Sequence, residues 1–428
     1  MSRFKPTLLT CLLSLPGALF AASPAEDTVR LPDMTVNEQQ ASNQPTVVST
    51  ETNAPASEAF TDLARQTAGL SVNDGGGRGF GETVTLRGLS NTPFFSDASA
   101  PVYLDNIPLA SVFTFPTELY DYSQMNVYRG PQANALFGRA GDAGVIQFTS
   151  AAAGDKATAH FGITIGDYNA HTFTAAAQTA RTDQFDASIH LGSSQRDGYI
   201  ENTQLHTDVD YKHALFGRIG LHYRPAKDLE ISLNVLGQQS NDGAQALVPL
   251  GGPDYTVSRG KEGVSDADFG AVALGIAKKF TDSTLTATTS VSDWNLSPYS
   301  NRLVVFGGVN FDSVLNQSQH AFNEELRYTS DYVTGGAFFS HSKTEGGASR
   351  TFSGFTIEDS DFKLSSDSFA LFGQANLKPA DGWLVTPGLR LEHDAKDFTT
   401  WKGCPQTRSS NRTTAGTPYC PASRSRVI

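Results

Sequence analysis

The stretch at 127–148 reads VYRGPQANALFGRAGDAGVIQF, with glycines at 130, 138, 141 and 144 between two apolar ends. A phosphate-binding loop of the Walker type needs a lysine followed by a hydroxyl residue, and this stretch contains no lysine. The run DGGGRGFGE at 74–82 precedes a predicted strand and does not open a helix, so it does not match a dinucleotide fingerprint. Both glycine runs therefore indicate tight turns that use the positive φ available to glycine.

The residues around this stretch, 58–153, have the pattern of a small α/β domain. SEAFTDLARQTAGL predicts a helix with Ser57 as its cap and Gly69 as its stop. Short strands are predicted at 82–89, 100–109 and 123–131, each bounded by glycine, proline or asparagine. About 95 residues can bury one modest core.

From residue 154 to 428 the pattern changes to long alternating segments. In LEISLNVLG, at 229–237, apolar side chains alternate with polar ones, which is typical of a strand with one apolar face. About eleven such segments follow one another: 157–166, 171–180, 184–193, 212–224, 228–240, 266–280, 283–295, 317–329, 332–343, 366–379 and 382–394. We therefore expect an antiparallel transmembrane β-barrel.

The connections between these segments support that interpretation. Short turns such as PAKD and TDS alternate with long polar stretches, for which we expect loops at 241–265, 296–316 and 344–365. Outer-membrane barrels have short periplasmic turns, long external loops and aromatic girdles. Aromatic residues that fit a girdle lie beside the short turns: Tyr223, Phe280, Tyr328, Tyr332 and Trp383.

The N-terminus predicts export. Residues 1–22 carry Arg3 and Lys5, then an apolar run and small residues, as in a secretory signal peptide. Residues 23–57 form an acidic, proline-containing leader, in which DTVRLPDMTV is either a linker or a short strand offered to a partner. The formal net charge of −12 argues against binding to nucleic acid.

Two cysteines remain after the signal peptide, Cys404 and Cys420. In an oxidising compartment we expect them to form a local disulfide, worth about 3 kcal/mol in the entropic model. A metal site is disfavoured because no histidine lies between them.

We find no constellation that predicts an enzyme, a cofactor or a metal site. His160, His171 and His190 lie in alternating segments as expected of wall residues. Glu324 and Glu325 are adjacent on a predicted strand, so they face opposite sides and cannot share one site.

The opening stretch, extended to YDYSQMNVYRGPQANALFGRAGDAGVIQFTS, resembles the plug-domain signature of TonB-dependent outer-membrane receptors. Three further pieces agree in order: DLARQTAGLSV, TVTLRGLS and PVYLDNIPL. FNEELRYTS and PGLRLEHD resemble the family's barrel-strand motifs. The resemblance implies an outer-membrane location and uptake of a scarce nutrient, most often a ferric siderophore, with the TonB complex as the energising partner.

The resemblance also implies roles for individual residues. It identifies a TonB box with the residues Val29, Arg30, Leu31, Pro32, Asp33, Met34, Thr35 and Val36. We expect the plug residues Arg87 and Arg129 to pair with the inward-facing wall carboxylates Glu325 and Glu392. The alternative is that each arginine is solvated in the lumen.

The resemblance to this family implies a barrel of about twenty-two strands. This sequence finishes with PYCPASRSRVI, which we interpret as part of an outside loop, so we expect a chain truncated at about half a barrel. The alternative function is a non-transporting receptor fragment that acts as a surface binding or structural element.

Overall fold

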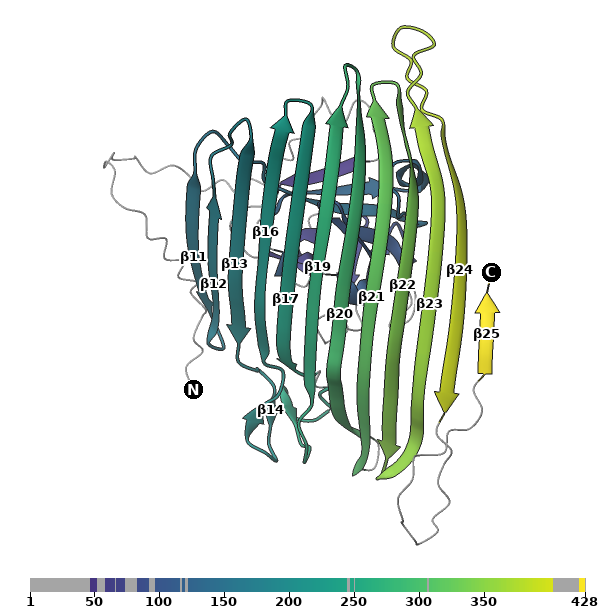
Figure 1. Cartoon of the computed structure of the whole chain (residues 1–428). Helices are drawn as coiled ribbons and strands as arrows, with labels where there is room; N and C mark the ends of the chain where they lie inside the picture. Colours follow the sequence, from purple (N-terminus) through teal and green to yellow (C-terminus); the bar gives the residue numbers. More distant parts are fainter. Residues whose placement is uncertain are drawn as a thin grey trace, which may run out of the picture.

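The computed structural model describes residues 47–51, 58–65, 67–73, 83–91, 97–115, 118–119, 122–244, 247–249, 251–305, 308–402 and 423–427. A small mixed domain lies behind a tall antiparallel sheet in Figure 1. We call the small domain the plug and the tall sheet the wall. The predicted signal peptide, the segment at 29–36 and the pair Cys404 and Cys420 lie outside the described residues.

The plug is built on a five-stranded sheet in the order β1-β9-β10-β6-β7. Its strands are β1 (Val47–Glu51), β6 (Asp97–Leu104), β7 (Ile107–Ser111), β9 (Tyr122–Arg129) and β10 (Gly144–Ser150). β9 and β10 are antiparallel, with Val127 opposite Ile146, so the stretch at 127–148 forms two paired strands and the turn between them.

Shorter elements complete the plug. They are the helix α2 (Phe60–Arg65), the sheet β3 (Leu70–Asn73), β4 (Thr83–Leu86) and β5 (Leu89–Ser90), the pair β2 (Glu58–Ala59) and β8 (Glu118–Leu119), and the 3-10 turns η1 (Val112–Thr114) and η2 (Pro131–Ala135). The predicted helix and the predicted strand at 123–131 are confirmed, whereas the strands predicted at 82–89 and 100–109 are each divided by a two-residue turn into two paired strands. α2 buries Phe60 and Ala64, four residues apart on one face, and Gly69 follows it with φ of 79°.

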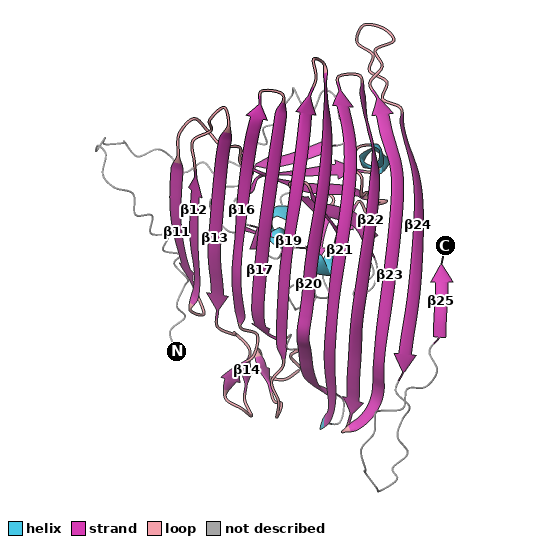
Figure 2. Cartoon of the chain, viewed as in Figure 1, coloured by secondary structure: helices cyan, strands magenta, loops and turns pink. Residues whose placement is uncertain are grey.

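The wall contains the predicted segments in one continuous sheet, drawn in magenta in Figure 2. Its strands in order are β11 (Thr158–Gly166), β12 (Ala170–Gln178), β13 (Phe185–Arg196), β16 (Lys212–Ala226), β17 (Leu229–Gly243), β19 (Val264–Lys279), β20 (Ser283–Val305), β21 (Val309–Ser330), β22 (Val333–Phe352), β23 (Phe355–Ala375), β24 (Gly388–Lys402) and β25 (Ser423–Val427). All neighbouring pairs are antiparallel, as predicted.

Two of the loops predicted in the wall are wrong. The stretches at 296–316 and 344–365 are mostly strand, because β20 runs to Val305, β21 begins at Val309, and β22 and β23 are separated only by Ser353 and Gly354. Backbone pairing continues outside the lipid, where both faces can be polar, so the alternation stops before the strand does.

The two strand boundaries nearest the C-terminus also differ from the prediction. The segment at 382–394 begins six residues later, as β24 at Gly388, after Pro387, which cannot donate to a ladder. Residues 423–427, which were interpreted as loop, pair with β24 as β25.

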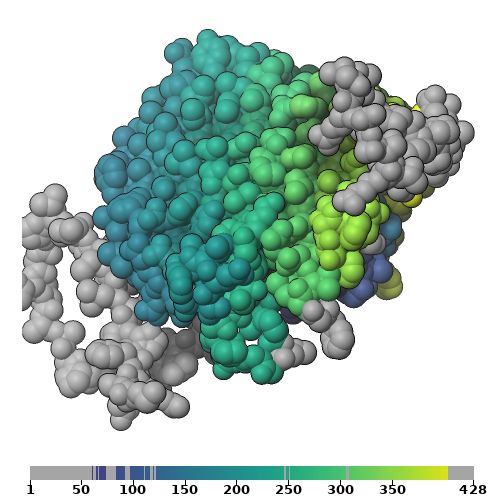
Figure 3. Space-filling view, turned by 90° about the horizontal axis from the view of Figure 1, so that it is seen from below, coloured from purple at the N-terminus to yellow at the C-terminus, as the bar shows by residue number. Residues whose placement is uncertain are grey.

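The two ends of the wall differ. Turns of two or three residues join β16 to β17, β19 to β20 and β21 to β22 at the upper end in Figure 1. The lower end carries a separate small sheet of β14 (Glu201–Asn202), β15 (Thr207–Asp208) and β18 (Thr256–Val257). We assign the upper end to the periplasm and the lower end to the outside. Figure 3 looks at the outer end, where a little of the purple plug is visible beside the wall.

Candidate functional site at the contact between plug and wall

The plug packs against one face of the wall, which we call the inner face. Its core cluster includes the wall residues Ala271 and Ala273, two residues apart on β19. Small side chains at these positions allow the plug sheet to approach the wall closely. Nearby, the ring of Phe113 in the plug lies 4.6 Å from that of Trp294 on β20. The contact between the plug and the inner face of the wall is therefore partly apolar.

The turn after β9 is one part of the plug that the wall holds through charged side chains. Gly130 adopts φ of 77° before η2, and Pro131 occupies the first position of η2, where its missing N–H is not needed. Phe137 packs on the rings of Tyr103 and Tyr128, with centroids 5.1 and 4.8 Å away. This packing fixes the backbone of the residues that follow.

Two wall residues contact that backbone directly. Arg390 on β24 donates from Nη1 to the carbonyl of Phe137 at 3.0 Å and from Nη2 to the carbonyl of Gly138 at 2.8 Å. Glu325 on β21 accepts from the amide of Gly138 at 3.1 Å. We call Arg390, Glu325 and the backbone at 137–138 the clamp. Hydrogen bonds of this kind to charged groups contribute about 1.5–3 kcal/mol each.

Neighbouring charges orient both clamp residues. Glu392 accepts from Arg390 Nε at 2.7 Å and from its Nη2 at 2.6 Å. Arg327 pairs with Glu325 at 2.5 Å, and its guanidinium lies 5.4 Å from the ring centroid of Phe137. Each pair is two residues apart on one strand, so its members share the inner face.

Residue 138 must be glycine because there is no room for a side chain at this position. A Cβ at this position would overlap Glu325 Oε2 and the ring of Phe338. The next residue, Arg139, donates from Nη2 to Ser340 Oγ at 3.0 Å on β22. The Tyr103 hydroxyl donates to the carbonyl of Arg139 at 3.0 Å and accepts from its amide at 2.7 Å. Burial raises the pKa of Tyr103, with a further contribution from Glu325, so its hydroxyl keeps its proton.

Further polar contacts join other parts of the plug to the wall. Asp105, in the turn after β6, accepts from Arg218 Nη1 on β16 at 3.2 Å and also from the amide and hydroxyl of Ser150. Gln319 donates to Ser111 Oγ at 3.1 Å, and Lys396 pairs with Asp97 at 2.5 Å. The contacts therefore span β16 to β24.

The structure brings two of the four predicted anchoring residues to this contact. Glu325 meets the plug directly, and Glu392 acts through Arg390. Arg129 instead donates to the carbonyl of Ala68 inside the plug, and Arg87 lies against Gly130, also inside the plug. The role of these residues in holding the plug stays a prediction.

Sequence reasoning missed the plug side of the clamp and the pair of Asp105 with Arg218. A carbonyl or amide that binds a wall side chain has no signature in the sequence, because every residue has one. Arg218 could have been selected as an inward-facing charge in an alternating segment. Its partner could not, because the register between plug and wall is set only in three dimensions.

The outer end of the wall is held by a second polar network. The buried Arg259 donates to Asn301 Oδ1 at 2.9 Å and to the carbonyl of Arg302 at 3.1 Å. Asn202 donates to the carbonyl of Arg259 at 2.8 Å and to Glu262 at 2.7 Å. Burial lowers the pKa of Arg259, which Glu262 partly opposes. This network fixes the small sheet that is presented to the outside.

Within the described part of the chain, no group of three or more histidine, cysteine, aspartate or glutamate side chains is placed to hold a metal ion. None of the helices in the described residues is long and apolar enough to cross a membrane.

A small sheet domain clamped to the inner face of an antiparallel wall, whose other face carries a band of apolar residues, is the arrangement of a plugged outer-membrane barrel. Residues 37–145 match the family model described as TonB-dependent receptor plug domain. The pesticin receptor of Yersinia enterocolitica is 29% identical over 157 residues, which cover 35% of this chain and 23% of that protein. Residues 37–145 therefore form a plug domain of the TonB-dependent receptor type, and the chain as a whole has the fold of a plugged outer-membrane barrel.

Solved structures show the same fold. The ferric yersiniabactin uptake receptor of Yersinia pestis matches with a TM-score of 0.74 at 16% identity, over 89% of this chain and 60% of that one. The siderophore receptor PiuA of Acinetobacter baumannii matches with a TM-score of 0.64 at 15% identity, over 90% and 61%. This chain therefore spans about 60% of the length of these solved receptors.

Proposed function

We propose that this chain acts in the TonB-dependent uptake of a scarce nutrient, with a ferric siderophore as the ligand. The ligand class is suggested by similar proteins, which include a ferric yersiniabactin uptake receptor and a siderophore receptor. The observation that carries the proposal is the clamp, in which the wall holds the plug through the backbone of the turn at 137–138.

The topology of the plug suggests how a pull from the periplasm reaches this turn. β1 is the first described strand after the leader, and it is an edge strand that pairs only with β9. Val47 lies opposite Tyr128, two residues before Gly130. In our proposal the TonB complex binds residues 29–36 and draws on β1. Force on β1 then acts on β9 and the turn that follows it.

The clamp suits a plug that must be held and then released. Its hydrogen bonds are few and charge-assisted, and water can replace each of them once the plug moves. In this proposal the outer end, with the small sheet around Arg259, receives the ligand. Release of the clamp opens a path along the inner face of the wall.

The test is growth on a ferric siderophore as the sole iron source, in a host that lacks its own siderophore receptors. We expect growth that requires the chain, a functional TonB and residues 29–36. The control is a chain in which residues 39–46 of the same leader are replaced by glycine and serine. Ligand binding at the cell surface without TonB-dependent uptake would contradict the proposal and favour a non-transporting surface binding protein.

A further inference from the structure

The outer face of the wall, opposite the plug, changes character along the strands β20 to β24. Side chains that contact the plug or the inner network, such as Trp294, Gln319 and Ser340, alternate with side chains that point outward. The outward positions nearer the periplasm are apolar, for example Phe339 and Phe369, which are 40% and 48% exposed and lie opposite each other. This part of the outer face meets lipid chains.

Polar residues replace the apolar ones toward the outside. Asp293, His320 and Lys343 form one cross-strand row, and Asp293 pairs with His320. His341 and Asp367 are opposite each other and lie within 2.6 Å. Phe322 shares the row of His341 and Asp367, so the lipid-facing band ends at that row.

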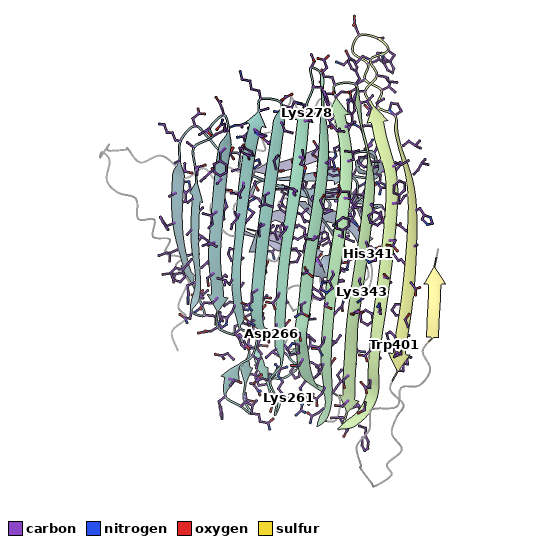
Figure 4. All side chains as sticks on the ribbon, viewed as in Figure 1. Lys261, Asp266, Lys278, His341, Lys343 and Trp401 are labelled. Carbon is purple, nitrogen blue, oxygen red and sulfur yellow. The ribbon has the colours of Figure 1, made fainter. Side chains whose placement is uncertain are left out.

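A hollow of about 380 Å³ lies in the next two rows. Most of the lining residues are outward members of these rows: Asn295, Ser318, Glu345 and Lys363 in one row, and Asn316, Gly347, Asp361 and Trp401 in the other. Gln317, Gly346 and Phe362, at alternate positions, complete the lining. Figure 4 labels Trp401 and Lys343 on this face, toward the outer end, with the plug behind the wall. The hollow thus opens outward, away from the lumen.

Gly347 creates the space in the floor of the hollow. A Cβ there would contact Asp361 Oδ1, so a side chain at this position would reduce the space in the hollow. Lysines flank the hollow on the side of the membrane. Lys343 Nζ lies 2.7 Å and Lys363 Nζ 3.4 Å from the same oxygen of Glu345.

The depth of the hollow relative to the membrane indicates which kind of molecule it can bind. On β21 the outward residues that follow Phe322 toward the outside are His320, Ser318 and Asn316, and Ser318 lies about 13 Å along the strand from Phe322. That step leads from the hydrocarbon core into the headgroup layer of the outer leaflet. We propose that the hollow binds the phosphorylated sugar headgroup of a glycolipid in that leaflet.

The lining suits this chemistry. The half-buried indole of Trp401 presents a flat apolar surface to the face of a sugar ring, as aromatic side chains do at membrane interfaces. Asn316, Asn295 and Asp361 offer donors and acceptors for hydroxyl groups. Lys343 and Lys363 can turn from Glu345 to a phosphate, which each ammonium binds as a point charge.

The experiment uses the full chain in detergent and measures lipid binding by native mass spectrometry. The probes are an acylated diglucosamine bisphosphate, its dephosphorylated form, phosphatidylglycerol, and glucosamine phosphate without acyl chains. The test variants are Trp401→Ala and the double variant Lys343→Ala with Lys363→Ala. Lys278→Ala, at the periplasmic end of the same wall and paired with Asp228, is the matched control.

We expect the double variant to weaken binding of the acylated bisphosphate about thirty-fold, from roughly a five- to sixfold loss for each lysine. Trp401→Ala should weaken binding of both acylated sugars, and Lys278→Ala should leave binding unchanged. Equal affinity for phosphatidylglycerol would overturn the sugar assignment. Equal affinity for the sugar phosphate without chains would replace the lipid by a free ligand, and unchanged binding in both test variants would overturn the site. Folding of each variant is checked by its heat-modified mobility on a gel.

Discussion

The inner and outer faces of the wall come from the same strands, and they hold their partners differently. Adjacent residues show this most clearly. Glu325 points inward and accepts from the backbone of Gly138, whereas Glu324 points outward and accepts from Thr289 Oγ1 on the neighbouring strand at 2.6 Å. One glutamate therefore joins two domains, and the other joins two strands of one sheet.

This difference between Glu325 and Glu324 shows that the structural effect of a charge in a barrel depends on the face that carries it. On the inner face, groups excluded from water meet fixed backbone dipoles, so each lost contact leaves a buried partner unsatisfied. On the outer face, the hydrogen bond to Glu324 lies within the sheet, so its loss leaves the contact between plug and wall in place. We therefore expect substitutions of similar chemistry to have unequal effects on the two faces.

Arg390→Ala should give the largest effect. It removes the donors to Phe137 and Gly138 and leaves Glu392 without its partner, so we expect the seated plug to lose about 3 kcal/mol. Trp294, which is 3% exposed and stacked on Phe113, reports the seating of the plug by fluorescence. The measurement is denaturant unfolding in detergent, with Trp383 and Trp401 changed to phenylalanine. An unchanged Trp294 transition would show that the clamp does not hold the plug.

Gly138→Val should rank second, at about 2 kcal/mol, because overpacking forces the turn away from Glu325 and Phe338. Gly154→Val is the matched control, since nothing lies within 4 Å of a Cβ at that position. The same Trp294 transition measures both variants. Equal behaviour of the two would mean that the close approach at 138 has no energetic consequence.

The wall could be predicted from sequence because the lipid imposes a period of two on its outer face. The segment at 283–295 was found in this way, whereas the continuation of β20 to Val305 was not. Outside the lipid nothing requires one face to be apolar, so pairing continues without a signal. Small outer strands such as Glu201–Asn202 are too short to show any period.

Only the wall side of the clamp could be predicted from the sequence. Alternation placed Glu325 and Glu392 inward, and this follows from strand geometry alone. Their partners are Arg390 and the backbone at 137–138, and Arg129 contacts Ala68. Which plug group meets which wall residue depends on how far the plug sits along the strands. Local sequence holds no information on that distance.

The pH dependence of stability gives a further test of the buried inner face, through the hydroxyl of Tyr103. Its pKa is raised by burial, so above the ordinary tyrosine pKa of about 10 the unfolded state releases a proton that the folded state keeps. Stability should therefore be unaffected below pH 10 and fall above it, by up to about 1.4 kcal/mol for each pH unit. Unfolding at pH 9 and 11 measures this, and Tyr103→Phe should remove part of the loss. Tyr328→Phe, on the exposed girdle, is the control, and an equal change in both variants would contradict the assignment.

Glu324→Gln should give the smallest effect, within about 0.5 kcal/mol, because glutamine can still accept from Thr289 and places no charge in the lipid-facing row of Phe339. Glu325→Gln, one residue away, should cost about 1 kcal/mol, since the amide of Gly138 and the guanidinium of Arg327 both lose a charged acceptor. The two variants match in size, chemistry and position along β21. They differ only in the face of the wall on which the changed residue lies. If the Trp294 transition shifts equally in both, the contrast between the faces of the wall fails. If it shifts only in Glu325→Gln, the inward charge holds the plug and the outward charge serves the sheet.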